Sequence, residues 1–145
     1  MLTRVLTSLA AALSLGIAVP ATADAAAPAG VYGCDGTLID TIDHPYDGRV
    51  VATTYLYWDG TYNCAVAVKK GSYEGVRTRR DLLLFNNTGA QPRSDEDDGR
   101  YLYYAGPVKV YGRNACIATE LTMWNTANYD IFLHRSPYDG YFHCG

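Results

Sequence analysis

The stretch that decides the fold is RVVATTYLYWDGTYNCAVAVK, residues 49–69. Apolar and aromatic side chains recur at every second position on both sides of Asp59-Gly60. This alternation is typical of β-strands, so we expect strands at Arg49–Trp58 and Thr61–Lys69. Asp and Gly both tolerate the positive φ of a two-residue type I′ turn. The stretch therefore predicts an antiparallel hairpin.

A two-residue turn would also set the register of this hairpin. It places Tyr57 opposite Tyr62 and Tyr55 opposite Cys64, so one face carries apolar and aromatic side chains. The other face carries mainly small and polar residues and ends at Lys69. The pattern predicts a half-buried antiparallel ladder.

The remainder of the chain shows the same alternation, interrupted by turn residues, and no stretch keeps a helical spacing. Asn86–Gly99 is polar and predicts a loop. The further predicted strands are Tyr73–Thr78, Leu82–Phe85 after a bulge near Arg80-Asp81, Tyr101–Tyr111, Ala115–Trp124, Tyr129–Arg135 and Tyr141–Cys144. Seven or eight short strands, as an approximate count, favour an all-β fold, a small antiparallel β-sandwich with a small β-barrel as the alternative.

Residues 1–23 have the layout of a secretory signal peptide. Arg4 precedes the uncharged apolar run Val5–Val19, and small residues close the segment at Ala23. The run, about 15 residues, is shorter than the roughly 20 that a spanning helix needs. We therefore predict cleavage before Asp24, a mature domain of residues 24–145 without a membrane span, and a secreted, extracellular or cell-surface location.

Length and charge limit the function classes. The chain has 145 residues and a formal net charge of −3, which favours one domain and excludes a two-domain cofactor enzyme or a basic polymer-coating tail. We expect no cofactor. Loss of Arg4 would make the product slightly more acidic, so we expect no general nucleic-acid binding.

The four cysteines Cys34, Cys64, Cys116 and Cys144 all lie in the predicted mature domain. In an oxidising compartment an even number predicts two disulfides. The gaps between the cysteines are too long for a zinc site, so we expect no metal. Three connectivities are possible, and we favour Cys34–Cys64 with Cys116–Cys144, because each joins elements that are close in sequence.

Two sets of side chains could bind a partner. Arg77 and Arg79 would share one face of a strand, with Lys69 on the same side, which gives either a solvated surface or a site for a phosphate polymer such as wall teichoic acid. Tyrosine is abundant, with 13 in the chain. Tyr101, Tyr103 and Tyr111 have one parity and Tyr104, Val108 and Val110 the other, so one set should face outward and could stack on sugars or meet a protein.

Candidate catalytic groups are scarce. His134 or His143 could combine with Glu74 or Glu120 and with Arg77 in a small secreted hydrolase. Such combinations arise by chance, and no G-x-S-x-G elbow is present. We assign no catalytic residue and interpret the protein as non-enzymatic.

Ser94–Gly99 holds four carboxylates. Clustered oxygen atoms suit calcium, but the spacing is not that of an EF-hand, so a hydrated loop tip is the main interpretation and calcium binding the alternative. Asn86-Asn87-Thr88 fits the glycosylation sequon.

Several short motifs resemble the spore-associated protein A family of small secreted proteins in filamentous actinobacteria. The resemblance spans Cys34–Gly145 and rests on Asn63-Cys64-Ala65-Val66, Tyr104-Ala105-Gly106-Pro107-Val108, Cys116 after a Gly-containing turn, and His143-Cys144-Gly145. The segment Ile117–Glu120 departs from the Trp-Gly-rich run of that family. The resemblance implies secretion and association with the spore or cell envelope, and it implies no catalytic residues.

The sequence as a whole favours a secreted, non-enzymatic protein that binds a polymer or protein of the spore surface or cell envelope. One alternative is a protease inhibitor or antimicrobial protein that presents the loop Gln91–Gly99. The other is the small hydrolase.

Overall fold

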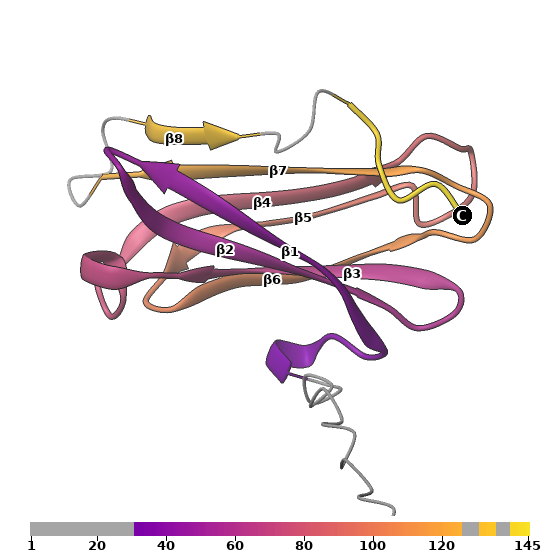
Figure 1. Ribbon diagram of the computed structural model, residues 1–145, viewed down its shortest axis with the longest axis horizontal. Helices are drawn as coiled ribbons and strands as arrows, with labels where there is room; N and C mark the ends of the chain where they lie inside the picture. The colour runs from indigo at the N-terminus through magenta and orange to yellow at the C-terminus, as the bar shows by residue number, and fades with distance from the viewer. Residues whose placement is uncertain (1–30, 126–130, 136–139) are drawn as a thin grey trace, which may run out of the picture.

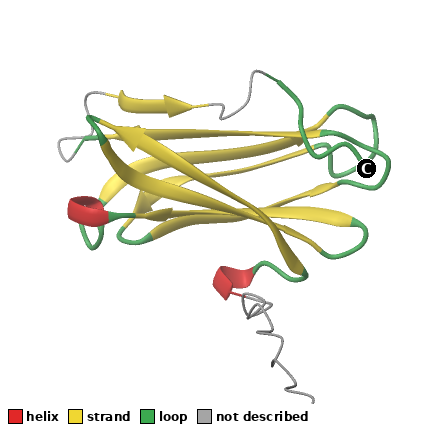
Figure 2. Ribbon diagram, in the orientation of Figure 1, coloured by secondary structure: helices red, strands yellow, loops and turns green. Residues whose placement is uncertain are grey.

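The described part of the chain consists almost entirely of strands. The computed structural model describes residues 31–125, 131–135 and 140–145. Two short 3-10 helices, η1 (Val31–Gly33) and η2 (Gly71–Tyr73), interrupt the strands (Figure 2). In these ranges no helix is long and apolar enough to cross a membrane. The predicted all-β class is confirmed, and the predicted signal peptide lies outside the described residues.

The strands form two antiparallel sheets that stack as layers (Figure 1). The first sheet has the order β1-β2-β3-β6 and contains β1 (Thr37–Tyr46), β2 (Arg49–Trp58), β3 (Tyr62–Lys69) and β6 (Tyr104–Tyr111). The second has the order β5-β4-β7-β8 and contains β4 (Thr78–Asn86), β5 (Ser94–Tyr101), β7 (Ile117–Trp124) and β8 (Ile131–Arg135). The fold is therefore the predicted sandwich and not a closed barrel.

The main core lies between the sheets. Leu56 on β2, Val108 on β6, and Leu82 and Leu84 on β4 are all buried in one cluster with Leu121 on β7. These side chains come from alternate positions of their strands, which is the pattern expected of two facing sheets.

A second, smaller cluster covers the outer face of the first sheet. It contains Tyr57, Val66 and the disulfide-bonded Cys34 and Cys64. The N-terminal segment around η1 lies on this outer side (Figure 1). Both faces of the β2–β3 hairpin are therefore buried. The predicted half-buried ladder, with one buried face, is wrong in this respect.

The β2–β3 register differs from the prediction by two residues. Tyr57 pairs with Cys64 and Trp58 with Asn63, because the connection is longer than two residues. The Asp59 carboxylate accepts hydrogen bonds from the backbone amides of Thr61 and Tyr62 at 2.9 and 2.7 Å. A shift of two leaves each side chain on its predicted face. The two-residue Asp-Gly turn is found instead at Asp47-Gly48, where both φ angles are positive and Tyr46 pairs with Arg49.

The predicted strand around Tyr73–Thr78 is wrong. Residues 71–73 form η2, and β4 runs without a register shift from Thr78 to Asn86. The predicted bulge near Arg80 is therefore absent from β4. The predicted C-terminal strand is reduced to one bridge between Ile117 and Phe142.

The predicted polar loop 86–99 is confirmed over residues 87–93 and wrong from Ser94, because Ser94–Tyr101 is the edge strand β5. The carboxylates of β5 alternate between exposed and half-buried positions along the strand. Those of Asp95 and Asp97 accept backbone amides of β6, from Lys109 at 2.8 Å and Gly106 at 2.6 Å. These bonds join one edge of the second sheet to the first.

The predicted strand Tyr101–Tyr111 is confirmed over Tyr104–Tyr111 but begins too early. β5 ends at Tyr101 and β6 begins at Tyr104. Within β6 the register shifts near Gly106, whose φ is 101°. Because of this turn and this shift, counting every second residue from Tyr101 does not predict which face of the sheet the later side chains occupy.

The disulfides have the favoured connectivity, Cys34–Cys64 and Cys116–Cys144, with no free cysteine among the described residues. The first holds the N-terminal segment to β3, and the second holds the C-terminal segment to the start of β7.

Candidate functional site

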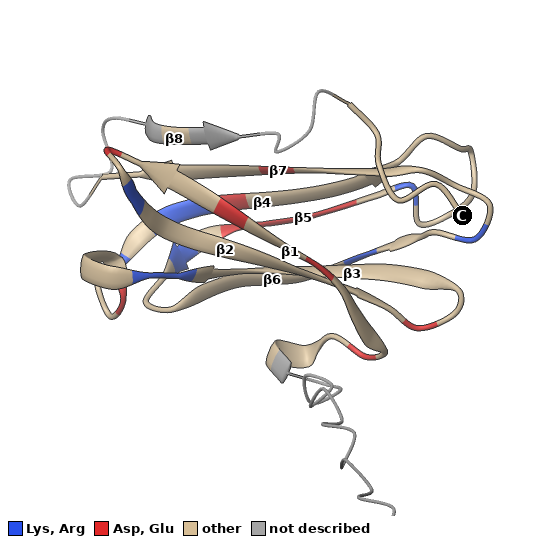
Figure 3. Cartoon of the chain, viewed as in Figure 1, with Lys and Arg blue, Asp and Glu red and all other residues tan. Residues whose placement is uncertain are grey.

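Lys and Arg gather at the end of the sandwich where η2 lies (Figure 3). The predicted basic surface of Lys69, Arg77 and Arg79 is nevertheless not formed. Lys69 is fully buried, because it is the last inward-facing residue of β3. Placing Lys69 beside the two arginines was therefore wrong.

The Lys69 ammonium is held between the two sheets. Its Nζ donates to the Thr78 hydroxyl at 2.9 Å, to the Tyr101 carbonyl at 2.9 Å and to the Val76 carbonyl. Burial, together with the charges of Arg80 and Arg77, lowers the pKa of Lys69 to about 8. The residue links the sheets and is not available to a ligand on the surface.

Arg79 and Arg77 are exposed but engaged. Arg79 Nε and one terminal nitrogen donate to the Asp98 carboxylate at 3.0 and 2.7 Å, and its guanidinium lies 4.6 Å from the Trp124 ring. Arg77 donates to the Arg100 carbonyl at 3.0 Å. An anionic polymer would have to compete with these contacts, particularly with the bidentate one.

Arg80 follows Arg79 on β4 and therefore points to the opposite, inner face of the sheet. It is fully buried, and its guanidinium nitrogens make no hydrogen bond to any described residue. Burial lowers the pKa of Arg80 to about 9. An unpaired buried charge is costly, so this position is a destabilising feature of the core.

The three predicted tyrosines have different environments. Tyr103 is 58% exposed. Tyr101 is half-buried and packs against the main core, and its hydroxyl donates to Asp97. Tyr111 is half-buried at the far end of β6, edge-on to Tyr62 with centroids 6.0 Å apart. Of these three tyrosines, Tyr103 is the one with an exposed side chain, and binding by any of them stays a prediction.

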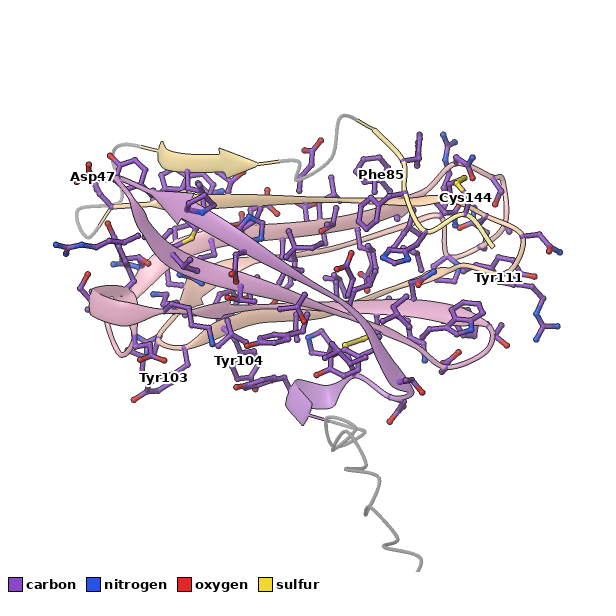
Figure 4. The ribbon with its side chains drawn as sticks, viewed as in Figure 1. Asp47, Phe85, Tyr103, Tyr104, Tyr111 and Cys144 are labelled. Carbon is purple, nitrogen blue, oxygen red and sulfur yellow. A yellow bond between two sulfur atoms is a disulfide. The ribbon has the colours of Figure 1, made fainter. Side chains whose placement is uncertain are left out.

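An exposed aromatic surface does exist, on the outer side of the first sheet. Tyr103 and Tyr104 point away from the sandwich there (Figure 4). Tyr32 lies against Tyr104, with ring centroids 5.0 Å apart and planes tilted by 56°. We call Tyr32, Tyr103 and Tyr104 the tyrosine patch.

Lys70 provides a positive charge that interacts with Tyr32 of the tyrosine patch. Its Nζ lies 3.1 Å from the Tyr55 hydroxyl and 5.5 Å from the centre of that ring. The hydrogen bond to Tyr55 raises the pKa of Lys70, and Tyr32 adds to this effect. The patch thus combines aromatic rings, hydroxyl groups and one retained ammonium.

Tyr32 and Tyr104 were not among the binding residues predicted from the sequence. Tyr104 was assigned to the same face as Val108, and this assignment failed because of the register shift at Gly106. Gly106-Pro107 was the available signal, since proline cannot donate to a strand ladder and often accompanies a bulge.

The predicted combination of His143 with Glu74 or Glu120 is not formed among the described residues. His143 Nε2 lies 2.9 Å from Asp40 Oδ2, not beside Glu74 or Glu120. Glu120 is on β7, where it pairs with Leu83 of β4. His134 belongs to β8, where it pairs with Thr122, and its side chain lies outside the described residues.

The predicted hydrated tip at Ser94–Gly99 is also absent, because β5 occupies this segment. Among the described residues, no group of three potential metal-ligating side chains could hold an ion. Asn86 of the sequon is buried, and its Nδ2 donates to the carbonyls of Ala90, Pro92 and Tyr111. The folded protein therefore shields this acceptor.

Comparison with known proteins identifies no relative: no family model, no curated protein and no solved structure matches the chain.

Proposed function

We propose that the protein is exported, carries out no catalysis, and binds a polysaccharide of the cell envelope or spore surface through the tyrosine patch. The observation that carries the proposal is the exposure of Tyr32, Tyr103 and Tyr104, at 37%, 58% and 38%, on one side of a disulfide-linked sandwich. Tyrosine rings present apolar area with a polar tip, which suits the C–H faces and hydroxyls of sugars.

The size of the patch favours a repeating polymer over a protein. A stable protein interface buries about 800 Å² on each partner, and three rings provide only a fraction of that area. A polysaccharide repeats the same sugar units along its length, so a patch that contacts only a few units has many equivalent positions to occupy. Wall teichoic acid is less well supported, because Arg77 and Arg79 are engaged and Lys69 is buried.

The test is co-sedimentation of the mature protein with purified envelope, with and without extraction of phosphate polymers. We expect Tyr103→Ala/Tyr104→Ala to reduce the bound fraction about tenfold, because several rings each contribute of order 1 kcal/mol. Arg77→Ala/Arg79→Ala is the matched control and should bind as the native protein does. Circular dichroism checks that each variant is folded.

Two results would contradict the proposal. In one, the tyrosine variant sediments as much as the native protein. In the other, the arginine variant or the extraction abolishes binding, which would favour the phosphate polymer.

A further inference from the structure

A pocket of about 220 Å³ lies at the end of the sandwich opposite η2, beside the C-terminus. It is lined by Ile39, Trp58, Asn63, Gly112 and the C-terminal residues His143–Gly145. Ligand pockets for drug-sized molecules occupy about 300–1,000 Å³. This volume therefore suits a single small ring.

Asn63 supplies an unused polar group in the pocket. The residue is only 3% exposed, yet its side chain makes no hydrogen bond to a described residue, and its amide is not sealed in the core. A buried amide without a partner is costly unless a ligand or solvent satisfies it. Its oxygen and nitrogen can together accept from and donate to neighbouring hydroxyl groups.

Gly112 makes room for this arrangement. A Cβ atom at position 112 would overlap the Asn63 amide nitrogen and come within 2.8 Å of the Trp58 ring. The absence of a side chain therefore leaves the amide and the indole side by side. An aromatic wall next to a polar amide matches the two kinds of surface that a sugar ring presents.

His143 forms the rim of the pocket with a fixed ring. Its Nε2 binds the Asp40 carboxylate at 2.9 Å, which leaves Nδ1 without a partner among the described residues. Its φ of 47° is unusual for a residue other than glycine. The flanking contacts hold it there: Phe142 exchanges two backbone hydrogen bonds with Ile117, at 2.7 and 2.8 Å, and Cys144 is bonded to Cys116.

From these contacts we propose that the pocket binds one pyranose unit of a glycan, with Trp58 against the ring and with Asn63 and His143 Nδ1 bonded to its hydroxyls. The site shares no residue with the tyrosine patch. It extends the proposed function from adhesion to recognition of a sugar unit, and it can be tested separately.

The test is a titration of the mature protein with the methyl glycosides of glucose, galactose and N-acetylglucosamine. The chain has two tryptophans, so a Trp124→Phe background leaves Trp58 as the reporter. We expect a saturable change in fluorescence with at least one glycoside and a Kd on the order of 1 mM, as for other small ligands with few contacts. Asn63→Ala should raise that Kd at least about tenfold.

Arg77→Ala is the control, because Arg77 does not line the pocket and bonds to the Arg100 carbonyl, and this variant should bind the glycoside as the parent does. If Asn63→Ala does not fold, the side-chain amide resonance of Asn63 in the native protein should shift during the titration. The proposal is overturned if no glycoside changes Trp58 fluorescence or the Asn63 resonance at about 50 mM, a large excess over the expected Kd. An unchanged Kd in Asn63→Ala would also overturn it. Sedimentation of Tyr103→Ala/Tyr104→Ala reports on the tyrosine patch, and the titration of Asn63→Ala reports on the pocket, so failure at one site is distinguishable from failure at the other.

Discussion

Lys69 Nζ lies 2.9 Å from the hydroxyl oxygen of Thr78, and both residues are fully buried. Lys69 ends β3 of the first sheet and Thr78 begins β4 of the second, so this hydrogen bond joins the two layers. We predict that Lys69→Met lowers the free energy of unfolding by about 2–4 kcal/mol, because buried acceptors lose their donor. Urea denaturation measures the change.

The neighbouring Lys70→Met serves as the control. Lys70 is half-buried and bonds to the Tyr55 hydroxyl on the outer face, so its loss should cost less than about 1 kcal/mol. Equal effects of the two substitutions would contradict a special role for Lys69.

Arg80→Met is expected to stabilise the protein. The guanidinium is buried with no hydrogen bond to a described residue, and methionine of similar length removes the charge while filling the space. Replacing buried charges by apolar groups often increases stability by about 1–4 kcal/mol. Thermal and urea denaturation measure the gain, with Arg79→Met on the exposed face of β4 as the control. A loss of more than about 1 kcal/mol in Arg80→Met would show that the charge has a partner in solution.

Asp81 should make stability depend on pH. Burial raises the pKa of its carboxyl from 3.8 to about 6, and the charges of Glu96 and Asp98 contribute. The folded state then holds the proton more tightly than the unfolded state, so the contribution of Asp81 is complete below pH 3.8 and is lost as pH rises through about 6. Asp81→Asn should abolish this loss, so the variant should gain in stability relative to the native protein across that window. Urea denaturation at several pH values would show parallel curves for the two proteins if Asp81 titrates normally.

The acidic strand β5 is stabilised by hydrogen bonds to Asp97. The Asp97 carboxylate accepts the Gly106 amide at 2.6 Å and the Tyr101 hydroxyl. Asp97→Ala should cost about 2 kcal/mol, since charge-assisted hydrogen bonds contribute about 1.5–3 kcal/mol. Asp98→Ala, on the outer face of the same strand, should cost less than about 1 kcal/mol. Hydrogen exchange should show faster opening of β5 in the first variant only.

The fold was largely predictable because its hairpins carry the alternation that a half-buried strand requires. β2 agrees with the predicted bounds at both ends. β5 could not be found in this way, since its inward positions are Asp95 and Asp97, which bond to backbone amides instead of packing in an apolar core.

The surface was less predictable than the fold. Lysine side chains are usually exposed to solvent. Lys69 is buried because oxygen atoms of Val76, Thr78 and Tyr101, which only the folded chain brings together, accept hydrogen bonds from its ammonium group. The tyrosine patch likewise depends on contact between Tyr32 and Tyr104, which are far apart in sequence. The alternation of side chains within one strand cannot predict contacts between residues of distant segments.

Chemical-shift mapping of the mature protein with soluble fragments of envelope polysaccharide tests the proposed function most directly. We predict perturbed resonances at Tyr32, Tyr103 and Tyr104, in addition to those of the pocket around Trp58 and Asn63. Perturbations confined to the outer face of β4 and β5, around Arg79 and Asp98, or no perturbation at any fragment concentration, would contradict it.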